Sequence, residues 1–149
     1  MPVKDLWTII ADYANEYVLL DWVEQNLDKI DWGCLSSNPN AIHLIEKELE
    51  QTPNKIVWGC LSKNPNAVHI LEKNLDKINW SLIALNHNAM SLIEKNLDKI
   101  SWSLITENPN AMSLIEQNLD KIDWSLLSIN PNAIHLLEKN LDNVEWEYL

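Results

Sequence analysis

The sequence predicts an all-α protein, an α-solenoid of stacked short helix–turn–helix repeats of about 22 residues each. Three observations predict it. From Trp58 onward a tryptophan recurs every 22 residues, two stretches with helical apolar spacing follow each tryptophan, and an Asn-Pro-Asn motif separates them. One such unit is too small to bury its apolar side, so copies must stack on each other. The copies start at Trp32, Trp58, Trp80, Trp102 and Trp124, with a partial copy at Trp146.

We divide the chain into N-terminal capping helices, residues 1–31, and a helical repeat array, residues 32–149. Apolar residues at helical spacing predict a helix over about residues 4–14. The segment up to residue 31 resembles the back half of a repeat, clearly so only from Glu24 onward. An end unit has a single neighbour, so this divergence is typical of a cap.

The first helix of each repeat is short and begins at the tryptophan. The preceding residue is usually a good N-cap, although Val57 and Glu145 are exceptions. The helix should stop before the Asn-Pro-Asn motif, because a residue before proline avoids helical geometry. The predicted caps are Asp31, Asn79, Ser101 and Asp123.

The second helix begins inside the motif, with its first asparagine as cap and proline in the first turn, where a missing amide costs nothing. Residues 86–88 keep the cap and lose the proline. Apolar residues follow at helical spacing, as at Ile134, Leu137 and Leu141, and the small Ala133 would let a neighbouring helix approach closely. The predicted caps are Asn38, Asn64, Asn86, Asn108 and Asn130.

A further asparagine follows most of these second helices and should stop them by adopting the left-handed conformation. The first repeat has Glu48 at this place and is four residues longer, which is about one helical turn. We therefore expect its second helix to run one turn further and to end near Pro53. These stop asparagines are Asn74, Asn96, Asn118 and Asn140.

Two repeated features could serve either structure or binding. The second asparagine of each turn motif is not needed for capping; a ladder that bridges neighbouring turns is favoured over ligand contact. The tryptophans could form an exposed strip for peptides or sugars, but a core position is favoured, since large aromatics dominate burial.

A leucine-rich-repeat-like α/β solenoid is the alternative fold, because such repeats have a similar length. The spacing of Leu75, Ile78 and Trp80 matches the start of that pattern. The asparagine that the pattern requires comes three residues late, which favours the helical reading.

Composition excludes several classes of function. The net charge is −11 and the chain has no arginine, which argues against nucleic-acid binding. No apolar run is long enough for a membrane span, and the N-terminus does not resemble a secretory signal. Cys34 and Cys60 occupy equivalent places in neighbouring repeats, and we expect both to be reduced core residues of an intracellular protein.

No set of residues predicts catalysis or a cofactor. The repeated carboxylates, such as Glu72 and Asp76, share one environment in every copy, whereas acid–base catalysis needs two carboxylates in different environments. The repeated serines lack a partnered base. His43 and His69 should lie one layer apart, too far to share a metal without other ligands. We therefore expect no enzyme, no cofactor and no metal.

The Asn-Pro-Asn-Ala-Ile core with Leu-Asp-Lys-Ile-x-Trp resembles short repeats in uncharacterised proteins of giant DNA viruses of protists. The resemblance covers residues 21–146 and implies an AT-rich viral genome, which fits abundant Asn, Ile and Lys and absent Arg. It implies a location in the cytoplasm of an infected host cell or in a virion. Some such viral proteins pair an N-terminal F-box with repeats, and residues 6–13 resemble an F-box fragment faintly.

We therefore expect a non-catalytic scaffold that binds another protein. The alternatives are a structural or self-assembling viral protein, whose partner is itself, and, more remotely, a substrate adaptor with a degenerate F-box-like N-terminus. No nucleic acid or membrane partner is expected. Positions that vary between repeats are the candidate protein-binding residues, namely Ser37, Lys63, Leu85, Glu107 and Ile129 before the turn, and His43, His69 and His135 in the second helix.

Overall fold

The structure, a computed structural model, describes residues 26–144 and 146–148. Within these ranges every regular element is a helix and there is no β-strand. The predicted all-α class is therefore confirmed. The leucine-rich-repeat alternative is wrong, because it requires a strand in each repeat. The helix expected over residues 4–14, the F-box-like segment, most of the 1–31 cap and Glu145 lie outside the described residues.

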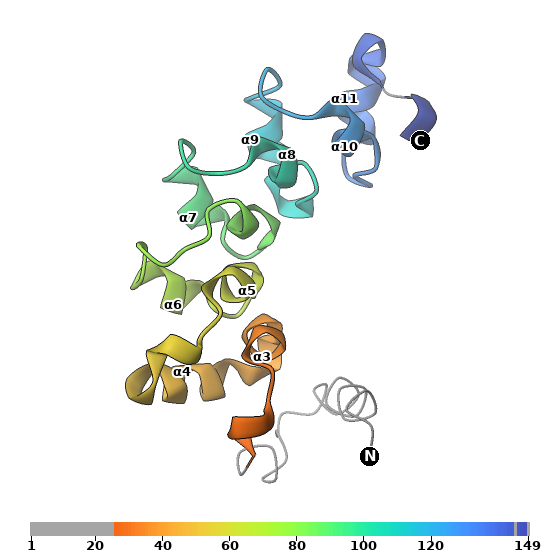
Figure 1. Ribbon diagram of the computed structural model, residues 1–149. Coiled ribbons are helices and arrows are strands. Elements are labelled where there is room, and N and C mark those ends of the chain that lie inside the picture. The colour runs from red at the N-terminus through yellow and green to blue at the C-terminus, as the bar shows by residue number, and fades with distance from the viewer. Residues whose placement is uncertain (1–25, 145, 149) are drawn as a thin grey trace.

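Each repeat contributes two short helices (Figure 1). The first helices are α3 (Trp32–Ser37), α5 (Trp58–Lys63), α8 (Trp102–Ile105) and α10 (Trp124–Ser128), and in the third repeat a 3-10 helix, η4 (Leu82–Leu85), takes this place. The second helices are α4 (Ile42–Gln51), α6 (Val68–Glu72), α7 (Met90–Glu94), α9 (Met112–Glu116) and α11 (Ile134–Lys139). The remaining 3-10 helices are η1 (Leu27–Lys29), η2 (Pro39–Ala41), η3 (Pro53–Lys55), η5 (Pro109–Ala111), η6 (Leu141–Asn143) and η7 (Trp146–Tyr148).

Successive helix pairs follow one another along a curved path (Figure 1). The first helices α5 and α8 lie toward the inner side of the curve, and the second helices α6, α7 and α9 lie along its outer side. The first four of these first helices pack on one another in chain order, α3 on α5, α5 on η4 and η4 on α8. The principal contacts thus join neighbouring repeats.

The core is a column of apolar side chains that runs through the repeats. Each repeat supplies a residue near the end of its first helix, an alanine after the turn and a residue inside the second helix. In the third repeat these are Ile83, Ala89 and Ile93, all 0% exposed. Burying an aliphatic side chain of this size stabilises by about 1.5–3 kcal/mol. The equivalent alanines, Ala41, Ala67, Ala111 and Ala133, are also 0% exposed, so the helices approach closely at this point as expected.

The first helices are capped as the sequence predicts. Asp31 accepts hydrogen bonds from Gly33 N (2.7 Å) and Cys34 N (3.0 Å). Equivalent bonds reach Asn79 and Ser101 from the amides of Leu82 and Leu104, and Asp123 from those of Ser125 and Leu126. Val57 gives no side-chain cap, also as expected.

Asp123 is suited to a test of these caps. The hydroxyl of Ser125 and the backbone amides of Leu126 and Ser125 donate to its carboxylate, and they lower its pKa from the ordinary value of 3.8. Because the unfolded chain then binds this proton more tightly, the carboxylate stabilises the fold above pH 3.8 and loses this effect as pH falls through its lowered pKa.

We expect Asp123→Ala to lower the free energy of unfolding by about 1 kcal/mol at neutral pH. Asp123→Asn should keep most of the cap, since asparagine caps as well as aspartate. The difference between wild type and Asp123→Asn in urea unfolding should stay constant from neutral pH down to the ordinary pKa of 3.8 and shrink below it, as the folded carboxylate takes up its proton. A pH-independent difference would contradict the assigned role of this carboxylate.

The second helix of the first repeat is longer than the others, as predicted. Helix α4 has 10 residues and ends at Gln51, just before Pro53, whereas α6 has 5. The additional turn buries the carboxylate of Glu48, which is 5% exposed. Glu48 Oε1 receives no hydrogen bond from the described residues, so Lys55 Nζ, 2.8 Å away, compensates it through charge.

We expect Lys55→Met to lower the free energy of unfolding by about 1–2 kcal/mol, because it leaves a buried carboxylate without a counter-charge. The loss stays below that of a fully buried pair since solvent reaches Lys55, whose side chain is 41% exposed. Lys99→Met is the matched control: both lysines lie over a tryptophan ring, but Lys99 has no buried carboxylate beside it. Equal losses in thermal or urea unfolding would show that Glu48 is irrelevant.

The stop asparagines work differently from the prediction. No described residue has a positive φ, and Asn140 has φ −135°. The prediction of a left-handed stop is therefore wrong. Instead, each side-chain amide donates to the carbonyl four residues earlier, as Asn96 Nδ2 does to Leu92 O at 2.9 Å. The side chain thus satisfies a carbonyl that the helix end leaves free. Asn74, Asn118 and Asn140 do the same.

Candidate functional site

The turn motifs of neighbouring repeats are joined by their first asparagines. Asn86 is 0% exposed, and its Nδ2 donates to Ser62 O at 3.1 Å and Asn64 O at 2.8 Å in the preceding repeat. Its Oδ1 accepts from Asn88 N at 3.1 Å, which closes the turn before α7. The N-cap of α7 is Ala89, which makes no side-chain cap bond, so the prediction that Asn86 caps the second helix is wrong. The equivalent Asn38 and Asn108 cap the short 3-10 helices η2 and η5, which precede α4 and α9. The side chain of Asn86 therefore closes its own turn and holds the repeat before it. Asn64, Asn108 and Asn130 make equivalent bonds to Ser36 O, Ala84 O and Thr106 O.

The second asparagines form a parallel set of bonds nearer the surface. Asn88 Nδ2 donates to Pro65 O at 3.1 Å, and Asn110 Nδ2 donates to His87 O at 2.8 Å. The change from proline to His87 leaves this bond intact, because only the main-chain carbonyl is used. Asn66 and Asn132 reach Pro39 O and Pro109 O. The predicted asparagine ladder is confirmed, and these amides serve repeat stacking.

The tryptophans are less buried than the sequence analysis expected. All five repeat tryptophans are half-buried and pack against the edge of the core. Lysine ammonium groups lie over three of the rings, Lys55 over Trp32 at 5.3 Å, Lys99 over Trp80 at 4.8 Å and Lys121 over Trp102 at 4.9 Å from the ring centre. The prediction of core tryptophans is wrong in this respect, since a lysine near the end of the same repeat covers the outer ring face.

The cysteines are also not core residues. Cys34 is exposed, Cys60 is half-buried, and both are free thiols. They occupy the third position of the first helix, where later repeats have Leu82, Leu104 and Leu126, which are half-buried as well. This helix face turns away from the core, because the fourth residue of the helix is the one that enters it.

The candidate binding residues before the turn lie at the ends of the first helices. Lys63, Glu107 and Ile129 are exposed, and Ile129 exposes 58% of its surface. Ser37 and Leu85 are half-buried, and Ser37 Oγ donates to Gly33 O at 3.1 Å. The backbone at this position repeats while charge and size change from copy to copy.

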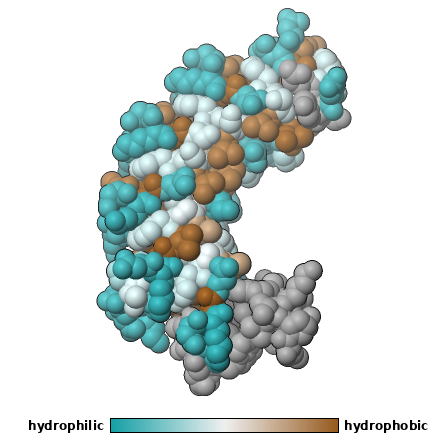
Figure 2. Space-filling view, in the orientation of Figure 1, coloured by the Kyte–Doolittle hydropathy of each residue, from teal (hydrophilic) through white to brown (hydrophobic). Residues whose placement is uncertain are grey.

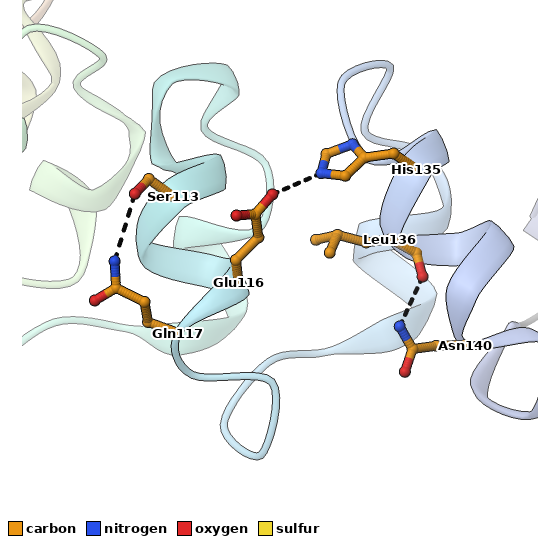
Figure 3. Close-up of polar contacts among 6 residues, drawn as sticks. All are labelled: Ser113, Glu116, Gln117, His135, Leu136 and Asn140. Carbon is orange, nitrogen blue, oxygen red and sulfur yellow. Dashed lines mark hydrogen bonds and ion pairs between the residues drawn. The ribbon is translucent and has the colours of Figure 1, made fainter.

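The candidate histidines lie on exposed parts of the second helices, and two of them pair with a glutamate of the preceding repeat. His69 Nε2 lies 2.8 Å from Glu46 Oε1, and His135 Nε2 lies 2.7 Å from Glu116 Oε1 (Figure 3). All four side chains are about half exposed, so the pairs contribute little stability. His43 is exposed too.

Residues 26–144 and 146–148 contain neither a metal-binding cluster nor a membrane-spanning helix. No group of three or more His, Cys, Asp and Glu side chains there is arranged to hold a metal ion. Within the same ranges, no helix combines the length and the apolar character that crossing a bilayer requires.

A surface hollow that the sequence does not predict lies beside the longer first repeat. The hollow has a volume of about 520 Å³ and lies where the insertion meets the second repeat. Its wall includes Leu49 and Asn54 on one side and Trp58 and Lys77 on the other. The four additional residues of the first repeat are its signal in the sequence, but their number alone predicts only a longer helix.

Comparison of the chain with protein-family models, with curated proteins and with solved structures finds no match.

Proposed function

We propose that the protein is a non-catalytic scaffold whose helical repeats form an α-solenoid that binds another protein. One observation carries the proposal: the first asparagines of the turns are identical from repeat to repeat and bond within the stack, whereas the residue directly before each of them varies. Asn64 and Asn86 join neighbouring turns, while Lys63, Glu107 and Ile129 one residue before those turns face solvent. A varied surface on a fixed repeat frame is how repeat proteins achieve recognition.

The two sides of the curved molecule differ in hydropathy. In Figure 2, hydrophilic residues dominate the outer side of the curve, and apolar patches lie along the middle and inner side. The half-buried leucines of the first helices, Leu82, Leu104 and Leu126, add apolar area beside the pre-turn residues. Contact with a partner through this side would bury that area.

The test compares two triple variants in affinity capture from extract of the cells in which the protein is made. The first variant changes the pre-turn residues, as Lys63→Glu, Glu107→Lys and Ile129→Ser. The matched control changes three exposed residues elsewhere, as Glu72→Lys, Lys95→Glu and Glu138→Ser. We expect wild type and control to retain the same partner and the pre-turn variant to lose it. No reproducible partner, or equal loss in both variants, would contradict the proposal.

A second candidate function, self-assembly, is favoured by apolar exposure in the last repeat. Ile134 is 62% exposed, Leu141 is 54% exposed and Trp146 is 65% exposed, whereas Met90 and Met112, at the place of Ile134, are partly buried. Copies that cover these residues should show a mass that rises with concentration in analytical ultracentrifugation, and Ile134→Ser with Trp146→Ser should abolish the rise. A constant monomer mass would exclude this function. The F-box adaptor remains a prediction on residues that the structure does not describe.

A further inference from the structure

The hollow between the first two repeats combines an aromatic wall with one cation. Leu49 and Ile56 supply aliphatic surface, Trp58 supplies a ring, Asn54 supplies an amide and Lys77 supplies the one charge of the lining. Its volume of about 520 Å³ falls within the range of about 300–1,000 Å³ that is typical of pockets for small ligands.

Trp58 differs from three of its counterparts because its ring is not covered by a lysine. The rings of Trp32, Trp80 and Trp102 each have an ammonium group within 4.8–5.3 Å of the centre. Lys77 holds the equivalent place in the second repeat, but its Nζ lies 3.3 Å from Asp76 Oδ2. Among the described residues no ammonium covers Trp58, which leaves its ring to line the hollow.

The loop after α6 begins with an exposed leucine. Leu75 is 47% exposed, whereas the equivalent Leu97 and Leu119 pack against the core; in the last complete repeat the equivalent Leu141 is exposed as well. Pro53 and Asn54, which follow the longer helix α4, line the same hollow as Lys77 of this loop. The longer first repeat thus coincides with an open space at the second tryptophan.

We propose that this pocket binds a segment of a partner peptide in which a carboxylate lies next to a large apolar side chain. The apolar side chain would lie on Trp58 and Leu49, and the carboxylate would pair with Lys77. The exposed pair of Lys77 with Asp76 is worth little, so its ammonium can exchange partners at small cost. The inference rests on the proposed scaffold function, because it names the chemistry of a bound partner.

The protein's net charge of −11 opposes anions in general, but distant charges are screened. At roughly 0.1 M salt the screening length is about 10 Å, so charges close to the pocket decide whether a carboxylate binds. The asparagine amide of Asn54 can donate to the same carboxylate or to a peptide carbonyl.

Three small probes test the pocket by NMR. N-acetylphenylalanine carries a terminal carboxylate, N-acetyl-aspartyl-phenylalanine amide carries a side-chain carboxylate, and N-acetylphenylalanine amide is the neutral control. The readout is the indole N–H signal of Trp58, with that of Trp80 as internal reference. We expect both acids to shift the Trp58 signal saturably and the neutral amide to bind about threefold more weakly, as an exposed ion pair allows. Whichever of the two acids binds more tightly shows whether the pocket prefers a terminal or a side-chain carboxylate.

Lys77→Gln should remove the advantage of the acids, whereas Lys99→Gln, at the equivalent place over Trp80, should leave it unchanged. Both lysines are exposed, so both variants should fold, which circular dichroism checks. Equal binding of acid and amide, an unchanged advantage in Lys77→Gln, or no selective shift of Trp58 would overturn the inference. The two proposals can fail separately. Partner capture tests the pre-turn surface, and probe binding at Trp58 tests the pocket.

Discussion

Asn86→Ala is expected to lower the free energy of unfolding by about 2–4 kcal/mol. The substitution removes the donor for Ser62 O and Asn64 O, which lie in the preceding repeat, and the acceptor for Asn88 N. Ser62 O then loses this partner in a buried region, at about 1–3 kcal/mol, whereas Asn64 O keeps its bond from Ala67 N. Loss of the turn bond from Asn88 N adds about 1 kcal/mol. Urea unfolding followed by far-ultraviolet circular dichroism measures the change.

Two further variants separate the roles of this side chain. Asn86→Asp keeps the oxygen that accepts from Asn88 N but cannot donate to the preceding repeat, so it should be at least as damaging as alanine. Asn96→Ala removes the bond to Leu92 O at the end of a helix and an exposed bond from Lys99 Nζ, and should cost only about 1 kcal/mol. If Asn86→Asp were nearly neutral, the bonds between repeats would not be what makes Asn86 important.

Ile115→Ala is expected to lower the free energy of unfolding by about 2–5 kcal/mol, because it opens a cavity in the apolar column. Ile115 is 0% exposed and belongs to the main core cluster, which runs through the repeats. Ile134→Ala is the matched control, since the same methyl groups are removed from a side chain that is 62% exposed. The control should change stability by no more than about 0.5 kcal/mol. Similar costs at the two positions would contradict the described core.

The features that the sequence predicted well depend on interactions within one repeat or on a mismatch between repeats. Asp31 and Asn79 follow local capping rules. The four additional residues near Glu48 lengthen helix α4 by one turn, and this length does not depend on how the repeats pack. The ladder was predictable because a second asparagine had no local task. Exact repetition of a polar residue therefore indicated a contact with the next copy.

The errors concern features that local sequence leaves open. Asn96 could end a helix by a left-handed backbone or by its side chain, and the same residue type suits both. The exposure of Trp80 depends on Lys99, which is 19 residues further along the chain and lies over the ring only in the folded repeat. The position of Cys34 outside the core depends on which face of a six-residue helix turns inward.

The binding surface was only partly predictable for a related reason. Variation among internal repeats directed attention to exposed residues such as Lys63 and Ile129. It could not direct attention to Trp58, which is identical in type to its counterparts and differs only in what covers it. An irregular repeat changes the surroundings of conserved side chains in the next repeat, and that effect requires coordinates.

Removal of residues 80–101, one complete 22-residue repeat, tests the stacking of equivalent modules most directly. The deletion would place Asn108 opposite Ser62 and Asn64, which now bond Asn86. If repeats are interchangeable layers held by neighbour contacts, the shortened chain should keep the same helical ellipticity per residue and unfold cooperatively at a lower urea concentration. Loss of helical signal or of a cooperative transition would show that the third repeat has a specific place in a globular core, and would contradict this account.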